Sequence, residues 1–264
     1  MAISTASGIG LRSPLPFDLD AGVGARAAIG LIVLASDQTI EHEFRQLCAL
    51  DGVALYQSRI ENDSRITPET LMAMRARITA ATDVILPGMP LDVAAFACTS
   101  ASMVIGEERV FDEIRKARPD ARPTTPITAA FAALGAFGAK RIALLTPYRQ
   151  DVNEGIRAYV EARGVEVTAM GSFEEEDDRR VCRISERSIK SAAIELGRDP
   201  AVEAVFVSCT SLRLLGVVGE IEAALDKPVT SSNHALAWHC LRLAGIEDVR
   251  EDKGRLFRLG LPEV

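Results

Sequence analysis

The stretch "VFVSCTSLR" (Val205–Arg213) decides the fold, because a buried-strand signal ends there on a cysteine and two small hydroxyl residues. A second copy, "AFACTSASMVIG" (Ala95–Gly106), has Cys98 in the position that Cys209 holds in the first. Apolar strands that end in small polar residues ahead of a helix are typical of parallel β–α units. We therefore predict two equivalent strand-to-helix turns, and Leu212 opens the helix of one of them.

Composition limits the class of protein. The chain has 264 residues, 48% of them hydrophobic, which is enough for one large domain or two domains of about 100–130 residues. Acidic residues outnumber basic ones by 37 to 30, and no run rich in Lys and Arg is present, so we expect no nucleic-acid partner. The longest near-apolar stretch, residues 127–139, is too short to cross a bilayer, so we expect no membrane partner.

The cysteines and the N-terminus indicate a compartment. Five cysteines without a C-x-x-C pair fit neither a disulfide framework nor a zinc site, so we expect reduced thiols and no metal. Residues 1–26 lack the features of a signal peptide and show no periodicity, and we interpret them as a flexible arm. Together these features predict a cytoplasmic protein.

Strand-like and helical patterns alternate along the chain, which favours parallel sheets covered by helices. Thr67 is a candidate N-cap with Pro68 at the first helical position, and Ser185 is a second candidate cap. A helix is predicted over 102–117. The three prolines in residues 117–126 predict a linker.

An internal repeat supports two similar domains. Cys98 and Cys209 lie 111 residues apart, and so do Asp37 and Tyr148, each of which follows the first strand of its half. "RITPETL" (65–71) resembles "RISERSI" at an offset of 118, which a displaced insertion explains; chance resemblance of short segments is the alternative. We predict an α/β fold of two parallel-sheet domains related by a pseudo-twofold axis, with the active site between them.

The expected domain limits follow from the linker and the repeat. The first domain is predicted to comprise residues 27–122 plus 228–264, and the second residues 123–227. In parallel sheets, functional residues gather at the carboxyl ends of strands. Asp37, Cys98, Tyr148 and Cys209 all fall there, so we expect one cleft that holds two cysteines.

Two cysteines at helix starts suggest acid–base chemistry. The free N–H groups of a first helical turn favour thiolate and lower a cysteine pKa, and neighbouring hydroxyls add donors for a carboxylate or enolate. One thiol could then take a proton while the other gives one, without a cofactor. The alternative is that each cysteine is a small buried hydrophobe and each "TS" a helix cap. The hydroxyl donors of the two turns are Thr99, Ser100, Thr210 and Ser211.

The segments "FACTSAS", "LLTPY", "VSCTSLR" and "PVTSSNHALAWHCLRLAG" resemble the aspartate/glutamate racemase superfamily. The chain is most similar to the maleate cis–trans isomerase and arylmalonate decarboxylase group, and "GLIVLASDQTIEHEF" resembles the ectoine-utilisation protein A branch. The resemblance implies two Rossmann-like domains, no cofactor and a small carboxylate substrate. It also implies that Cys98 and Cys209 are catalytic and that Tyr148 contacts the substrate.

One position departs from the group. Maleate isomerases have an asparagine, which binds a substrate carboxylate, where this chain has Asp37. An ionised aspartate would repel that carboxylate but could hold an ammonium or amide N–H, so we expect an amino-acid-like substrate. Arylmalonate decarboxylases keep one of the two cysteines, and the presence of both argues against simple decarboxylation.

The function expected from these observations is a cofactor-independent isomerase or racemase acting on a small carboxylate or amino-acid-like substrate, assembled as a homo-oligomer. A decarboxylase and a non-catalytic carboxylate-binding protein are the alternatives. His239 is interpreted as structural and Asn233 as a cap of the last helix. The acidic run 174–178 is interpreted as a solvated loop, and the nearby Arg179, Arg180 and Arg183 as less favoured carboxylate ligands.

Overall fold

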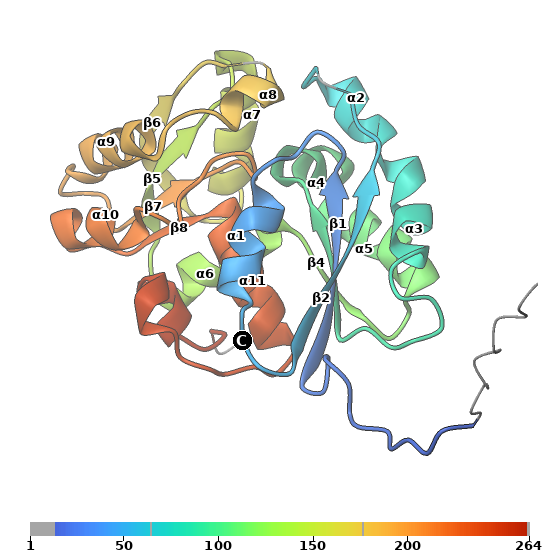
Figure 1. Cartoon of the computed structure of the whole chain (residues 1–264). Coiled ribbons are helices and arrows are strands. Elements are labelled where there is room, and N and C mark those ends of the chain that lie inside the picture. The colour runs from blue at the N-terminus through green and yellow to red at the C-terminus, as the bar shows by residue number, and fades with distance from the viewer. Residues whose placement is uncertain (1–13, 64, 176, 263–264) are drawn as a thin grey trace, which may run out of the picture.

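Two four-stranded parallel sheets form the framework of the protein, in a computed structural model that describes residues 14–63, 65–175 and 177–262. The sheets have the same strand order relative to the chain, β2-β1-β3-β4 and β6-β5-β7-β8, and they stand side by side (Figure 1). The first contains β1 (Ala27–Leu34), β2 (Val53–Ile60), β3 (Val93–Ala97) and β4 (Arg122–Thr124). The second contains β5 (Arg141–Thr146), β6 (Glu166–Ser172), β7 (Ala204–Val207) and β8 (Val229–Ser231). The predicted fold class is confirmed.

Helices cover both sheets, as parallel strands require. Those that precede residue 122 are α1 (Ile40–Leu47), α2 (Pro68–Ala73), α3 (Arg75–Asp83), α4 (Thr99–Ile105) and α5 (Glu107–Ala117). The later ones are α6 (Pro126–Phe137), α7 (Gln150–Glu161), α8 (Asp178–Val181), α9 (Glu186–Gly197), α10 (Val218–Leu225) and α11 (Ser232–Leu243), followed by the 3-10 turns Glu251–Lys253 and Arg255–Arg258. None of these described helices has the length and apolar character needed to cross a membrane.

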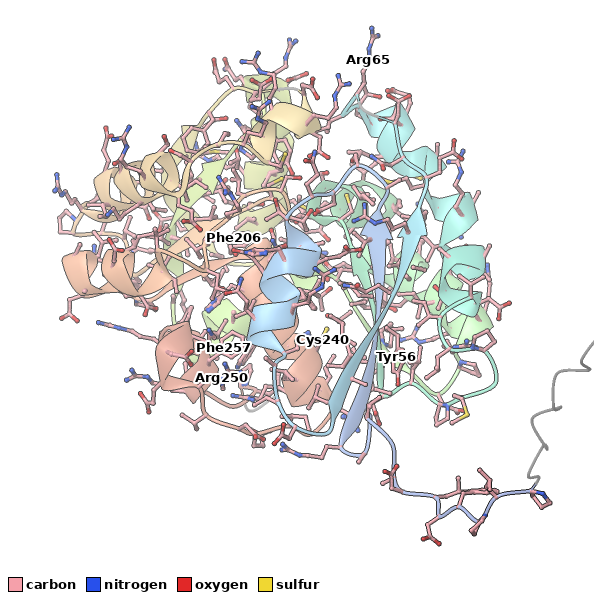
Figure 2. All side chains as sticks on the ribbon, in the orientation of Figure 1. Tyr56, Arg65, Phe206, Cys240, Arg250 and Phe257 are labelled. Atoms are coloured by element: carbon pink, nitrogen blue, oxygen red, sulfur yellow. The ribbon has the colours of Figure 1, made fainter. Side chains whose placement is uncertain are left out.

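A shared apolar layer joins the two sheets. Helices α1, α6 and α11 lie between them in Figure 1, and α6 packs directly on α11. Phe44, Trp238 and Phe257 are fully buried in the cluster that this layer forms with the first sheet. Burial of such aromatic side chains contributes about 2–3 kcal/mol each. Figure 2 shows Phe257 and Cys240 in this layer and Phe206 in the core of the second sheet.

The predicted caps are present. The Thr67 and Ser185 side chains accept hydrogen bonds from the backbone N–H three residues later, and Pro68 is the first residue of α2. The predicted helix over 102–117 is divided at Gly106, whose φ of +91° is readily adopted only by glycine.

Three sequence-based assignments need correction. The predicted linker contains β4, which pairs with β3 in the first sheet, so it is not an open connection; Pro123 lies in this short edge strand and Pro126 begins α6. No helix begins at Leu212, because the chain after Cys209 runs through turns until α10. The strand β2 was not predicted.

The domain limits stay a proposal. Strand β8 pairs with β7, so we propose that the return to the first domain follows Ser231 rather than residue 228. Of the predicted N-terminal arm, residues 1–13 lie outside the described residues, and residues 14–26 form neither helix nor strand.

Candidate active site

The two cysteines lie in the wall of one cavity, at the carboxyl ends of corresponding strands. Cys98 follows β3 and Cys209 follows β7, which are the third strands in the order of their sheets. The cavity has a volume of about 30 Å³ and shares lining residues with a wider pocket beside it. Ile66, Leu71 and Met74 supply apolar surface to it. The sulfur atoms therefore share a small, largely enclosed space.

Six of the eight predicted site residues line this cavity. They are Cys98, Thr99, Ser100, Tyr148, Cys209 and Thr210. The other two, Asp37 and Ser211, are buried beside it. The tertiary structure thus brings together side chains from both halves of the repeat.

Cys98 precedes α4 as its N-cap residue. Its thiol lies 3.8 Å from the Ser100 hydroxyl, and its carbonyl oxygen accepts a 2.6 Å hydrogen bond from Ser102. Burial raises the pKa of this thiol to about 11, although the Ala101 N–H and the Ser100 hydroxyl act in the opposite direction. The loss of hydration of the thiolate therefore raises the pKa more than the hydrogen-bond donors of this short helix lower it.

Cys209 has a different backbone but a similar electrostatic environment. The Ser211 N–H donates to its sulfur at 3.4 Å, and a hydrogen bond from Tyr148 also stabilises the thiolate. Burial, together with the negative charge of Asp178, nevertheless raises the pKa of Cys209 to about 12. The expectation of lowered thiol pKa values is wrong, because both cysteines are buried and the carboxylates of Asp37 and Asp178 raise their pKa values further.

Asp37 is held by the first turn of α1. Its Oδ1 accepts hydrogen bonds from the N–H groups of Thr39 at 2.7 Å and Ile40 at 2.8 Å. Its Oδ2 is buried without a hydrogen bond of normal geometry, although the Thr210 hydroxyl is close enough to lower the pKa of the carboxyl group. Burial has the larger effect and raises this pKa to about 6.

Asp178 is a site residue that sequence reasoning missed. It opens α8, lines the cavity, and accepts 2.7 Å hydrogen bonds from the hydroxyls of Ser36 and Ser211. Its negative charge raises the pKa values of both cavity thiols. The interpretation of residues 174–178 as a solvated loop is therefore wrong for Asp178. It ends a run of five acidic residues, and nothing in the sequence distinguishes it from the other four.

Glu43 is a second missed residue, and it organises the turn after Cys209. Its Oε1 accepts from the N–H groups of Leu214 and Leu215, at 2.9 and 2.8 Å, and its Oε2 accepts from Asn233 at 2.8 Å. Asn233 also donates to the Thr210 carbonyl at 2.8 Å. Burial raises the pKa of Glu43 to about 7.

The same contacts correct the interpretation of Asn233. It lies inside α11, and Ser231 caps that helix instead, accepting from the His234 N–H. His239 is buried and shares a 2.8 Å hydrogen bond with Thr124 far from the thiols, in agreement with a structural role.

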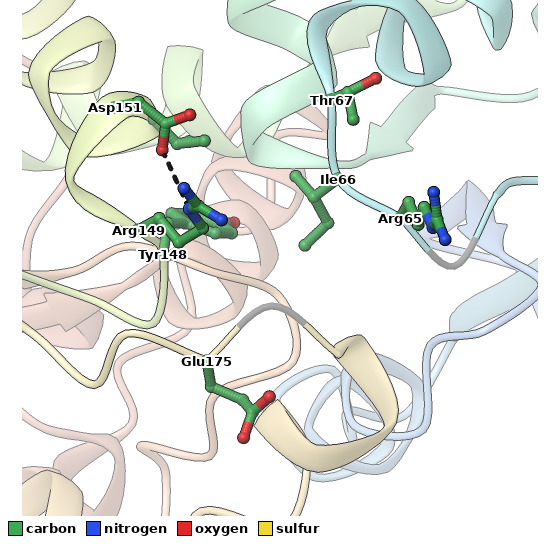
Figure 3. A pocket seen from close by; sticks show the side chains of 8 residues that line it. Arg65, Ile66, Thr67, Tyr148, Arg149, Asp151 and Glu175 are labelled. Atoms are coloured by element: carbon green, nitrogen blue, oxygen red, sulfur yellow. Dashed lines mark ion pairs between the residues drawn. The ribbon is translucent and has the colours of Figure 1, made fainter.

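A wider pocket adjoins the cavity. It has a volume of about 440 Å³ and shares Arg65, Ile66 and Tyr148 with the thiol cavity. Figure 3 shows Arg65 and Ile66 on one side and Tyr148 on the other, next to the ion pair of Arg149 with Asp151. This pocket offers one route by which a small molecule would approach the sulfur atoms.

The arginines near α8 do not line the cavity. Arg179 pairs with Asp177 at 2.9 Å and Arg180 pairs with Glu175 at 2.6 Å, and both arginines are exposed. Within the described ranges, no cluster of three His, Cys, Asp or Glu side chains could hold a metal ion.

Comparisons with known proteins agree with this geometry. The sequence profile of the family described as arylmalonate decarboxylase matches residues 65–257. The maleate isomerase of Nocardia farcinica is 28% identical over 240 residues, which cover 87% of this chain and 95% of that protein.

Solved structures give the same result. A mutant of the Nocardia farcinica maleate cis-trans isomerase with a covalently bound succinylcysteine intermediate superposes with a TM-score of 0.80 at 27% identity, covering 88% of this chain and 98% of that one. The maleate isomerase Iso from Pseudomonas putida S16 has a TM-score of 0.81 at 24% identity, with 88% and 98% covered, and supports the fold alone. With nearly three quarters of its residues matched by the family profile and the paired cysteines in one cavity, the chain belongs to the arylmalonate decarboxylase family, which its maleate isomerase relatives share.

Proposed function

We propose that this protein is a cofactor-independent isomerase or racemase that acts on a small carboxylate or amino-acid-like substrate through Cys98 and Cys209. The observation that carries the proposal is the placement of both sulfur atoms in the wall of one cavity, from equivalent strands of the two sheets. Two such thiols can exchange protons with opposite faces of a planar intermediate. The similarity to maleate isomerases supports the same chemistry.

For a substrate with a stereocentre beside its carboxylate, the reaction is a balanced proton exchange. One cysteine, as thiolate, takes the proton from Cα, and the electron pair of the broken C–H bond moves into the carboxylate as an enediolate. The other cysteine gives its proton to the opposite face of Cα. Thr99, Ser100 and Thr210 line the same cavity and supply hydroxyl donors for the enediolate oxygens.

For an alkene substrate, one of the two cysteines is enough for cis–trans isomerisation. Its thiolate adds to an alkene carbon, and the π electron pair moves into the adjacent carboxylate as an enediolate. The former double bond rotates as a single bond, and the pair then re-forms the double bond as the thiolate leaves. The succinylcysteine in the structure of the Nocardia farcinica enzyme supports this route as the second candidate.

Tyr148 is the proposed partner of Cys209 in either route. Its hydroxyl hydrogen-bonds to that thiol and stabilises the thiolate. Because burial and the neighbouring thiols raise the pKa of Tyr148 well above its usual value, the hydroxyl keeps its proton and remains a donor.

The proposal also covers the compartment, the family branch and the assembly. Free cysteines throughout the described chain support a reducing compartment such as the cytoplasm. The segment 30–44 supports a place in the ectoine-utilisation branch, and with it a diaminobutyrate-like substrate. Assembly as a homo-oligomer completes the proposal, with the mass in solution as its test.

The deciding experiment uses deuterated water. The protein is incubated with a panel of amino acids and, separately, with maleate, and the products are examined by NMR and mass spectrometry. Deuterium at Cα without conversion of maleate identifies a racemase, and fumarate from maleate identifies a cis–trans isomerase. Release of carbon dioxide from an arylmalonate would show a decarboxylase instead. Ligand binding without any turnover across the panel would contradict the proposal and favour a binding protein.

A further inference from the structure

Two carboxylates from different halves of the chain adjoin the thiol cavity. Asp178 lines it directly, and Asp37 lies next to Thr210, which also lines it. Each of these carboxylates raises the pKa values of Cys98 and Cys209, so both lie close enough to act on both sulfur atoms. Negative charge therefore reaches the cavity from two sides.

The contacts of these carboxylates leave acceptor capacity unused. Asp178 receives one hydroxyl hydrogen bond at each oxygen, from Ser36 and Ser211, although an ionised carboxylate accepts about four. Asp37 receives two backbone N–H bonds at Oδ1, whereas Oδ2, in a side chain only 2% exposed, has the Thr210 hydroxyl nearby but no hydrogen bond of normal geometry. A buried, unpartnered carboxylate oxygen is costly, and such atoms mark positions where a donor belongs.

Neither Asp37 nor Asp178 makes an ion pair with a described residue, and the Arg59 guanidinium, which donates to the Asp37 carbonyl at 3.0 Å, is paired with Glu41 at 3.1 Å. Arg65 lines the cavity, but it is exposed at the outer side that the wider pocket shares. A second carboxylate from a substrate would meet two negative charges there.

We propose that Asp37 and Asp178 form an ammonium-binding subsite, so that the substrate is a small amino acid rather than a dicarboxylate. This inference rests on the proposed function and narrows its substrate class. An ammonium group supplies the donors that the two carboxylates lack, and opposite charges in an enclosed site attract strongly, whereas like charges are excluded. The bound ammonium would also offset the negative field at the two thiols and favour the thiolate that catalysis needs.

The test compares inert ligands on the unmodified protein. β-Alanine and succinate differ by the exchange of an ammonium for a carboxylate, and neither can be racemised or isomerised. Calorimetric titration of the full chain at pH 7.5 should show β-alanine binding about tenfold or more tighter than succinate. 3-Hydroxypropanoate, which replaces the ammonium by a neutral hydroxyl, should bind about tenfold more weakly than β-alanine.

Variants test whether Asp37 and Asp178 cause the preference for β-alanine over succinate. Asp37→Asn and Asp178→Asn should each reduce the ratio of β-alanine to succinate affinity, and the double variant should reverse it. Glu61→Gln, which removes an exposed acidic charge paired with Arg77, should leave the ratio unchanged. If the double variant fails to fold, the comparison of β-alanine with 3-hydroxypropanoate on the wild type still decides.

Three outcomes overturn the subsite: tighter binding of succinate by the wild type, no binding of β-alanine at millimolar concentration, or an unchanged ratio in the folded double variant. The binding result is independent of turnover. A preference for β-alanine in a protein that exchanges no Cα proton would retain the subsite while the proposed catalytic function fails.

Discussion

The Ser36 hydroxyl donates a 2.7 Å hydrogen bond to Asp178 Oδ2, although 142 residues separate the two in the chain. Ser36 follows β1 of the first sheet, whereas Asp178 opens α8 in the second half. Helices α8 and α2 face each other above the sheets in Figure 1, and side chains from both line the thiol cavity. The cavity is therefore closed by contacts between the halves, and neither half contains it alone.

Replacing Ser36 by alanine should weaken this closure. Loss of one hydrogen bond to a carboxylate should lower the free energy of unfolding by about 1–2 kcal/mol and raise KM about fivefold, while kcat changes little. Denaturant unfolding and steady-state kinetics measure the two effects. Ser191→Ala, at an exposed position of α9, is the matched control and should change neither. An unchanged KM would show that Ser36 does not hold Asp178 for substrate binding.

Each thiol should be required for catalysis. Cys98→Ala and Cys209→Ala should each lower the rate of Cα proton exchange by about 100-fold or more, because a single cysteine can serve only one face of the planar intermediate. NMR measurement of deuterium incorporation gives the rates. Cys240→Ala removes an equally buried thiol from the core and should keep the activity. Activity retained in either cavity variant would refute a two-thiol mechanism.

The reactivity of the cavity thiols should rise steeply with pH. With pKa values raised to about 11 and 12, both are protonated at neutral pH, and the thiolate fraction grows about tenfold per pH unit. Alkylation by iodoacetamide, followed by mass spectrometry of each cysteine, should therefore keep accelerating between pH 7 and pH 10. The rate for a free cysteine levels off above a pKa of about 8.5. A plateau near pH 7 in the unliganded protein would mean that the thiolates are stabilised already.

Glu43 should make stability depend on pH. Its pKa is raised from 4.5 to about 7 by burial, so its contribution is full below pH 4.5 and is lost as the pH rises through 7. The free energy of unfolding of the wild type relative to Glu43→Gln should thus fall by up to about 3 kcal/mol across this window. The wild type must be compared with Glu43→Gln, because His234 and His239 make the free energy of unfolding rise with pH in both proteins. Their pKa values are lowered to about 4.

Urea unfolding of both proteins at pH 4.5, 6 and 8 measures this difference. As a positioning residue, Glu43 should also affect the pH profile of kcat, because it fixes the turn that carries Cys209, while KM stays nearly constant. If the difference in free energy of unfolding between the wild type and Glu43→Gln is the same at all three pH values, titration of Glu43 is excluded as the cause.

Much of the fold could be predicted from local pattern. The strands around Cys98 and Cys209 are continuous apolar runs, since parallel strands are buried on both faces, and Thr67 and Ser185 have the hydroxyl that a helix start requires. The backbone after Cys209 could not be predicted in the same way. Leu214 and Leu215 bond there to Glu43 from a distant helix, and these long-range bonds take the place of a helix.

The sequence by itself determined the repeat, the parallel sheets and the placement of two cysteines at the ends of equivalent strands, because periodicity and spacing are local properties of the chain. Only the tertiary structure decided the electrostatics of the site. Asp178 is one acidic residue in a run of five until folding places it beside both sulfur atoms, and burial then reverses the expected direction of the thiol pKa shifts. Charge and desolvation depend on which distant groups become neighbours, and no short stretch of sequence contains that information.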